Sequence, residues 1–154
     1  MGTTDTIGYL LQHTASMMYR QSDQVLQERL GLGMSQYKLL MILHEKPQIR
    51  QRVLADQLGQ TEASISRQIK LLVERGMLVV EINPKNRREH LTRPTARGVK
   101  VTQAAQEVLE EYHSPVFAQF NEKEQQMLNE LLHRVHVEVC GPRKPITCDK
   151  AFDL

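Results

Sequence analysis

The chain has 154 residues, of which 40% are hydrophobic and 25% charged, a composition typical of one globular protomer and not of a disordered chain. It contains no run of 18 apolar residues and no basic N-terminal segment followed by an apolar one. We therefore expect a cytoplasmic protein with neither a membrane span nor a signal peptide. Its two cysteines, Cys140 and Cys148, lie near one end, where they cannot join distant parts of a fold, and the simplest interpretation is two reduced thiols.

The positive charge is concentrated in the middle of the sequence. Residues 50–100 contain eleven Lys and Arg against five Asp and Glu, a net charge of +6, which leaves −4 for the rest of a chain whose total is +2. A local excess of positive charge raises affinity for phosphate groups through counterion release, while the other surfaces stay neutral or acidic. The distribution favours a nucleic-acid partner, although the total charge alone would not.

The N-terminal part predicts two helices separated by glycines. Apolar residues recur at three- and four-residue steps over residues 7–30, which is the period of an amphipathic helix. Gly31 and Gly33 end this helix, and Ser35 is a suitable N-cap for a second helix that stops at Pro47.

Two shorter helices follow, joined by a tight turn. The third is predicted over about residues 50–58 and closes at Gly59, which can adopt the left-handed conformation of a C-terminal cap. Thr61 is the predicted N-cap of a fourth helix over about residues 62–75, which ends at Gly76. Helices of these lengths, so closely connected, are typical of a helix-turn-helix.

A β-hairpin is predicted next. The β-branched run at residues 77–82 is followed by the turn formers Asn83 and Pro84 and by a second short run at residues 89–93. Pro94 should block further strand pairing. The hairpin tip carries three basic residues, Lys85, Arg87 and Arg88.

Two helices are predicted to complete the chain. Thr95 is the N-cap of a long helix, which we expect the Ser114–Pro115 pair to kink or break. Residues 121–124 resemble a capping box that starts a last helix, which ends before Gly141 and leaves a tail at residues 141–154.

The fourth helix has the faces expected of a helix that enters a major groove. Ile65, Ile69 and Leu72 share one face, while short polar side chains and one arginine lie opposite. Serine hydroxyls, an alanine methyl and an arginine fork can each contact base edges. The predicted base contacts are Ala63, Ser64, Ser66 and Arg67, with Arg67 as the main one. The alternative interpretation is an ordinary solvated helical face.

The hairpin tip and the helix N-termini supply the remaining predicted DNA contacts. An arginine in a narrow minor groove meets enhanced negative potential, so we assign Lys85, Arg87 and Arg88 to that groove; the alternative is a solvated charged turn. Phosphates can bind at helix starts and beside basic side chains. The predicted phosphate contacts are Ser35, Gln36, Lys38, Arg50, Arg52 and Lys70.

This order of parts resembles the MarR family of winged-helix transcription regulators, over about residues 7–139. The resemblance is carried by SQYKLL at 35–40, LADQL at 54–58, SISRQI at 64–69, LLVERGML at 71–78, NPKNRR at 83–88 and TARG at 95–98. It implies a mainly α fold with a small β-hairpin wing: a winged helix-turn-helix lobe at residues 35–95 between dimerisation helices at 5–30 and 96–139.

The resemblance also implies the activity. We expect a homodimer that binds a pseudo-palindromic double-stranded DNA site as a sequence-specific transcription regulator, in our prediction a repressor. Apolar stripes on both sets of outer helices agree with a dimer, although they could instead close one monomeric core. A helical interaction module that does not bind DNA is a further alternative, which the salt dependence of duplex binding would decide.

Two positions depart from the family pattern in the wing. Asn86 stands where the family commonly has an acidic residue two positions before the wing arginine, here Arg88, so an Asp–Arg pair that would hold the wing's shape is missing. Pro94 and Thr95 stand where the family usually has Leu-Thr, and we expect this to shorten the second strand of the wing.

The family resemblance further implies a small effector, often aromatic or phenolic, held between the dimerisation helices and the DNA-binding lobe. Methionine adapts to varied ligands, and tyrosine or histidine can orient a polar group; packing of these residues in the core is the alternative. The candidate lining residues are Met17, Met18, Tyr37, Met41 and His44.

We expect no enzyme and no cofactor, because the sequence has no Gly-rich phosphate loop, nucleophile elbow or His-Glu-x-x-His motif. A metal- or redox-responsive regulator is the alternative function. His133 and His136 are three residues apart on a helix and could bind metal with His113 and Cys140, whereas Cys140 and Cys148 could form a redox pair. Zinc content and a thiol titration would separate these possibilities.

Overall fold

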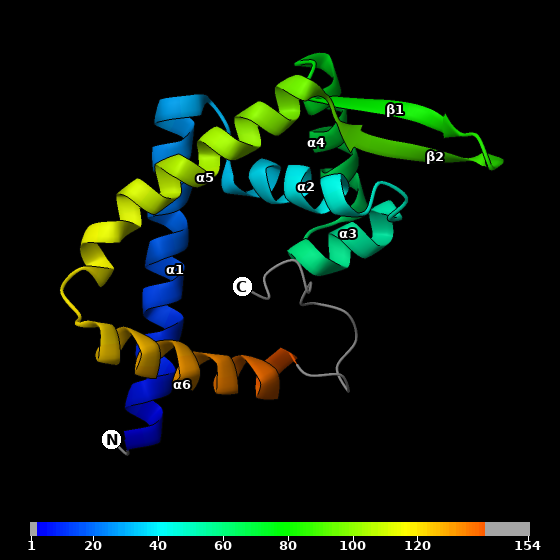
Figure 1. Ribbon diagram of the computed structural model, residues 1–154. Coiled ribbons are helices and arrows are strands. Elements are labelled where there is room, and N and C mark those ends of the chain that lie inside the picture. The colour runs from blue at the N-terminus through cyan, green and yellow to red at the C-terminus, as the bar shows by residue number, and fades with distance from the viewer. Residues whose placement is uncertain (1–2, 141–154) are drawn as a thin grey trace.

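The computed structural model describes residues 3–140, except for the side chains of residues 3–5, 89 and 140 (Figure 1). It confirms the mainly helical fold class with a single antiparallel hairpin. The elements are α1 (Thr3–Leu30), α2 (Met34–Glu45), α3 (Gln51–Leu58), α4 (Glu62–Glu74), β1 (Leu78–Asn83), β2 (Asn86–Pro94), α5 (Ala96–Phe117) and α6 (Glu122–Cys140). Helices α2 to α4 and the hairpin form one lobe, and α1, α5 and α6 extend away from it (Figure 1).

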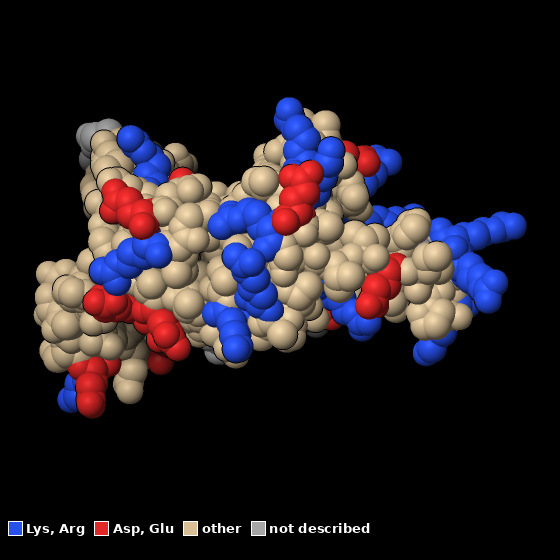
Figure 2. Space-filling view, turned by 90° about the horizontal axis from the view of Figure 1, so that it is seen from above, with Lys and Arg blue, Asp and Glu red and all other residues tan. Residues whose placement is uncertain are grey.

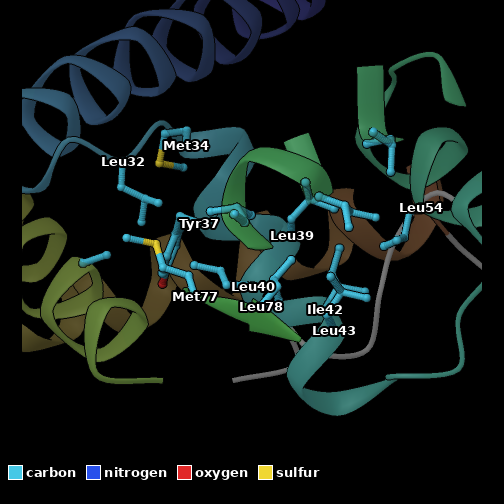
Figure 3. Packing of buried hydrophobic residues seen from close by; sticks show 14 of the residues in the cluster. Leu32, Met34, Tyr37, Leu39, Leu40, Ile42, Leu43, Leu54, Met77 and Leu78 are labelled. Carbon is cyan, nitrogen blue, oxygen red and sulfur yellow. The ribbon is translucent and has the colours of Figure 1, made fainter. Parts of the chain in front are cut away.

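Helix α2 lies at the centre of the hydrophobic core. Four of its apolar side chains are almost fully buried: Leu39, Leu40, Ile42 and Leu43. Figure 3 shows them between Leu54 of α3 and the pair Met77 and Leu78 at the start of the hairpin. Each buried aliphatic side chain of this size contributes about 1.5–3 kcal/mol. The core therefore joins the helix-turn-helix to the base of the hairpin.

The start of α2 differs from the prediction. Its N-cap is Gly33 and not Ser35, which lies inside the first turn. The Asp23 carboxylate of α1 accepts a hydrogen bond from the Met34 N–H at 2.8 Å, and the Gln36 side chain accepts one from the Gly33 N–H at 3.3 Å. The prediction was wrong because one of these two capping bonds comes from a residue of another helix, which the local sequence does not indicate.

The caps of α3 and α4 are confirmed. Gly59 has φ 62°, the left-handed conformation that glycine adopts without strain. The Thr61 hydroxyl oxygen accepts a hydrogen bond from the Ser64 N–H at 3.1 Å, so α4 begins one residue later. These two caps set the tight turn of the helix-turn-helix.

The two prolines act differently from each other. Strand pairing ends at Pro94, as predicted, although the strand is longer than expected, since β2 begins at Asn86 and Pro94 itself pairs with Leu78. As the last residue of its strand, Pro94 has no further ladder bond to lose. Pro115 does not break α5, which continues to Phe117. Only the last turn follows Pro115, so few helical hydrogen bonds depend on it.

The capping box of the last helix is confirmed. The Asn121 side chain accepts from the Glu124 N–H at 3.0 Å, and the Glu124 carboxylate accepts from the Asn121 N–H at 2.9 Å. The predicted stop of this helix at Gly141, and the tail that follows, lie outside the described residues.

The base of the hairpin is fixed to α5 and to the loop after α2. The Thr95 N–H donates to the Met77 carbonyl at 3.0 Å, and the Thr92 N–H donates to the Pro47 carbonyl at 2.9 Å. Gly98 in the first turn of α5 lies so close to Met77 that a Cβ there would be 2.1 Å from the Met77 carbonyl oxygen. Only glycine fits this approach.

The outer helices leave large apolar faces at the surface of the single chain. On α6, Met127 and Val139 are more than half exposed, and Leu131 and Val135 are almost half exposed. Ile7 on α1 is similarly exposed. Apolar patches of this extent are uncommon on monomers and mark interaction surfaces. None of the helices within residues 3–140 is long and apolar enough to cross a membrane.

Candidate nucleic-acid interface

Helix α4 presents the two faces that its sequence predicts. Ile65, Ile69 and Leu72 are buried in the core, whereas Arg67 is exposed. The other predicted base contacts are Ala63 and Ser66, which are exposed, and Ser64, which is half-buried. Lys70 is also exposed one turn further along. The predicted DNA contacts on α4 therefore have surface that is open to solvent. That these side chains contact DNA stays a prediction.

Four polar side chains form a hydrogen-bonded cluster between α2 and α4, which we call the Ser-Gln cluster: Ser35, Gln60, Ser64 and Gln68. The Ser64 hydroxyl donates to Gln60 Oε1 at 3.1 Å. Gln68 Nε2 donates to Gln60 Oε1 at 2.6 Å and to Ser64 Oγ at 3.3 Å. The Ser35 hydroxyl donates to Gln68 Oε1 at 2.9 Å, and Gln60 Nε2 donates to Ser35 Oγ.

Two residues of the cluster, Gln60 and Gln68, are not among the DNA contacts predicted from the sequence. Both are half-buried, and each connects Ser35 of α2 to Ser64 of α4. The four-residue spacing of Ser64 and Gln68 was a possible signal, since it places Gln68 one turn after Ser64 on the same helical face. The partner on α2 could not be identified from local spacing.

The predicted phosphate contacts fall into two groups. On α2, Ser35 and Gln36 are engaged in the internal hydrogen bonds given above, and the Lys38 ammonium lies over the Tyr19 ring, 5.0 Å from its centroid. Burial lowers the pKa of Lys38 below its usual value. The second group, Arg50, Arg52 and Lys70, is exposed, with Arg50 at the N-cap of α3. The second group therefore lies at the surface, whereas the side chains of the first group contact other residues of the protein.

The wing is the hairpin formed by β1 and β2, and its tip is held by two asparagines. The Lys85 N–H donates to Asn83 Oδ1 at 3.0 Å, and the Arg88 N–H donates to Asn86 Oδ1 at 3.2 Å. An asparagine that accepts from the backbone two residues on stabilises a turn locally. Asn86 thus gives the tip a side-chain to backbone contact at the position where an Asp–Arg pair was missing.

The three basic residues of the tip, Lys85, Arg87 and Arg88, are all exposed. Figure 2 shows Lys and Arg side chains around the projecting right-hand end of the molecule, where the wing lies in Figure 1. Further from the tip, Arg93 and Glu81 form an ion pair between the two strands. The basic tip is therefore presented on a paired and locally capped hairpin.

Two of the five candidate ligand residues line a common cavity. Met41 and His44 line a cavity of about 200 Å³ between α2 and α5, together with Val99 and Thr102. Tyr37 is buried in the core, and burial followed by the nearby Glu110 raises the pKa of its hydroxyl. The remaining candidates, Met17 and Met18, lie on α1 and are not part of that cavity lining.

The histidines considered for a metal site do not form one with the side chains that the structure describes. Among those side chains, no three of His, Cys, Asp or Glu are close enough to hold a metal ion. His113 is hydrogen-bonded to Ser22 of α1 at 2.8 Å, while the rings of His133 and His136 are 6.3 Å apart. The Cys140 side chain and Cys148 lie outside the part of the chain that the structure describes.

Comparisons with known proteins agree with this arrangement. Residues 32–90 match the model of the MarR family. Curated proteins gave no significant sequence match. The CouR protein of Rhodococcus jostii RHA1, solved with p-coumaroyl-CoA, is 23% identical with a TM-score of 0.74, covering 94% of this chain and 98% of that chain.

Two other solved structures are similar over a slightly shorter part of the chain. A structure of MarR is 26% identical with a TM-score of 0.72, covering 84% of this chain and 90% of that one. The Mycobacterium tuberculosis MarR family protein Rv2887, solved with p-aminosalicylic acid, is 20% identical with a TM-score of 0.70, covering 83% of this chain and 96% of that one. Residues 32–90 therefore match the MarR family, and the chain has the fold of MarR-family transcription regulators.

Proposed function

We propose that this protein is a sequence-specific regulator of transcription that binds double-stranded DNA and acts as a repressor. The observation that carries the proposal is the exposed face of α4, with small side chains around Arg67, beside a wing whose tip is basic. A helix with short side chains can approach base edges closely in the major groove, and Arg67 can bond two guanine acceptors. The wing arginines enter the adjacent minor groove.

We infer that the protein binds DNA as a homodimer. The support is the apolar surface of α6 and α1, where Leu131 and Val135 are 47% and 43% exposed and Ile7 is 53% exposed. Association of two copies through these faces would remove them from water, which is favourable in proportion to apolar area. A two-fold dimer places its α4 helices about 34 Å apart, one turn of DNA, and therefore binds a pseudo-palindromic site.

Substitution of two arginines separates base recognition by α4 from sequence-independent binding by the wing. Arg67→Ala should weaken binding to the preferred duplex by about 1–3 kcal/mol and relax the preference at one base pair. Arg88→Ala should weaken binding to every duplex and lower the slope of log affinity against log salt. Fluorescence anisotropy with matched and mismatched duplexes at several salt concentrations measures both effects.

Arg20→Ala is the matched control, because Arg20 is an exposed arginine on α1, away from α4 and the wing. It should change neither the sequence preference nor the salt slope. Equal losses on all sequences for Arg67→Ala would contradict its assignment as the main base contact.

An effector is proposed for the cavity beside Met41 and His44. The solved relatives bind p-aminosalicylic acid in one case and p-coumaroyl-CoA in another, and the cavity lies between the DNA-binding lobe and α5. A ligand that binds better to a dimer with misplaced α4 helices would shift the population away from DNA. Salicylate is a suitable probe: it should lower duplex affinity, and no change at millimolar salicylate would argue against an aromatic acid effector.

A further inference from the structure

The Ser-Gln cluster constrains the direction in which its two serines can hydrogen-bond. Ser64 uses its hydroxyl proton on Gln60 and accepts a bond from Gln68. Ser35 uses its proton on Gln68 and accepts from Gln60. A hydroxyl has one proton and two lone pairs, so each serine retains a single lone pair and no proton for another partner.

This conclusion does not depend on how the two carboxamides are oriented. The nitrogen and oxygen of a glutamine amide have nearly the same shape, and their assignment follows from the hydrogen-bond network. Rotating both Gln60 and Gln68 by 180° reverses every bond of the cluster. Ser64 then donates to Gln68 and accepts from Gln60, and Ser35 donates to Gln60 and accepts from Gln68. In either arrangement both hydroxyl protons remain inside the cluster.

The position of Ser64 makes this constraint relevant to DNA. Ser64 lies in the first turn of α4, two residues after the first helical residue Glu62, and is half-buried with part of its surface open. Residues in the N-terminal turns of such a helix are the ones that approach base edges in a major groove. A serine that rotates freely can donate or accept and therefore distinguishes bases poorly. A serine without a free proton can only accept.

We propose that Gln60 and Gln68 determine base specificity by holding the Ser64 hydroxyl as a hydrogen-bond acceptor. In the major groove, adenine N6 and cytosine N4 carry amino donors, whereas thymine and guanine present only acceptors. Ser64 then selects an adenine or a cytosine on the strand that it faces. The inference rests on the proposed function, because it requires α4 to lie in the groove.

The same constraint bears on Ser35, which was predicted to contact phosphate. A phosphate oxygen accepts hydrogen bonds and needs a donor, and the Ser35 proton is committed to the cluster. Ser35 therefore contributes to the orientation of α4 through Gln68 and not to phosphate binding through its hydroxyl.

A duplex that lacks a single amino group tests the proposal. Once the preferred site is known, the base facing Ser64 is the one whose preference changes in Ser64→Ala. Replacing that adenine by 2′-deoxyribosylpurine, or that cytosine by its analogue without the amino group, should weaken wild-type binding about tenfold, the effect of one lost hydrogen bond. Ser64→Ala should bind the two duplexes equally.

Removing the cluster should remove the selectivity while leaving binding in place. In the double variant Gln60→Leu/Gln68→Leu, the Ser64 proton is free, so the variant should bind thymine or guanine at that position as well as the amino base. Gln24→Leu is the control, since Gln24 is an exposed glutamine on α1 whose side chain donates to Glu28 of the same helix. It should keep the full wild-type preference.

Two results would overturn the proposal: equal wild-type affinity for duplexes with and without the amino group, or an unchanged preference in a folded double variant. If the double variant does not fold, the affinities of the wild type and of Ser64→Ala for the two duplexes still test whether Ser64 accepts a hydrogen bond from the base. Failure of the wild-type protein to prefer any duplex would instead contradict the proposed function itself.

Discussion

A Gly98→Ala substitution is expected to lower the free energy of unfolding by about 3 kcal/mol, the upper part of the range for an added group in a packed site. The new Cβ would lie 2.1 Å from the Met77 carbonyl oxygen and 3.1 Å from the Pro94 side chain. The closest atom belongs to the backbone, which cannot rotate away as a side chain can. The Met77 carbonyl also accepts the Thr95 N–H, so relief of the clash would disturb the junction of wing and α5.

Chemical denaturation followed by far-ultraviolet circular dichroism measures this effect. Gly8→Ala is the matched control, because a Cβ at Gly8 would meet no described atom within 4 Å and the residue lies inside α1. Alanine is favoured over glycine within a helix by about 0.5–1 kcal/mol, so the control should not lose stability. An unchanged denaturation midpoint in Gly98→Ala would contradict the close approach of α5 to Met77.

Two charges on the apolar face of α6 are expected to abolish high-affinity DNA binding. In the variant Leu131→Glu/Val135→Glu, each new carboxylate lies at the centre of the apolar stripe that would be buried between protomers. Burying an unpaired charge is strongly unfavourable, so the protein should become monomeric. A monomer contacts one half-site, and the loss of the linked second contact should lower affinity about 100-fold or more.

Sedimentation velocity and duplex titration of the same samples measure the two effects together. The control is Gln126→Glu/Asn129→Glu, which adds the same charge at exposed polar positions on the other side of α6. This variant should remain dimeric and keep its affinity for DNA. A wild-type protein that is monomeric at micromolar concentration while bound tightly to DNA would contradict the dimer.

The fold was predictable wherever the deciding interactions are local. The helical period of α1, the left-handed Gly59 and the Thr61 cap each depend on residues within one or two turns. The predicted N-cap of α2 was wrong by two residues, because the Met34 N–H bonds to Asp23, a residue of the preceding helix. The expected break at Pro115 is absent because this residue lies in the last turn of α5, where a lost backbone bond costs little. The extent of β2 was underestimated at its start, which is Asn86, whereas its end at Pro94 agrees with the prediction.

The candidate site was predictable in its position but not in its internal contacts. Residue type and helical period placed Arg67 and the wing arginines at the surface. They could not indicate that Lys38 lies over Tyr19, or that Ser35 is bonded to Gln68, since these contacts join residues on different helices. Contacts of this kind depend on how the helices pack, which a single sequence does not specify residue by residue.

Selection of bound duplexes from a random pool at about 50 mM salt tests the central claim most directly, because several phosphate contacts give strong binding under this condition. We expect the pool to converge on an inverted repeat whose half-sites are one helical turn apart, with a guanine near Arg67 and an adenine or cytosine facing Ser64. A pool that retains no duplex, or that retains duplexes without a common sequence, would contradict a sequence-specific regulator.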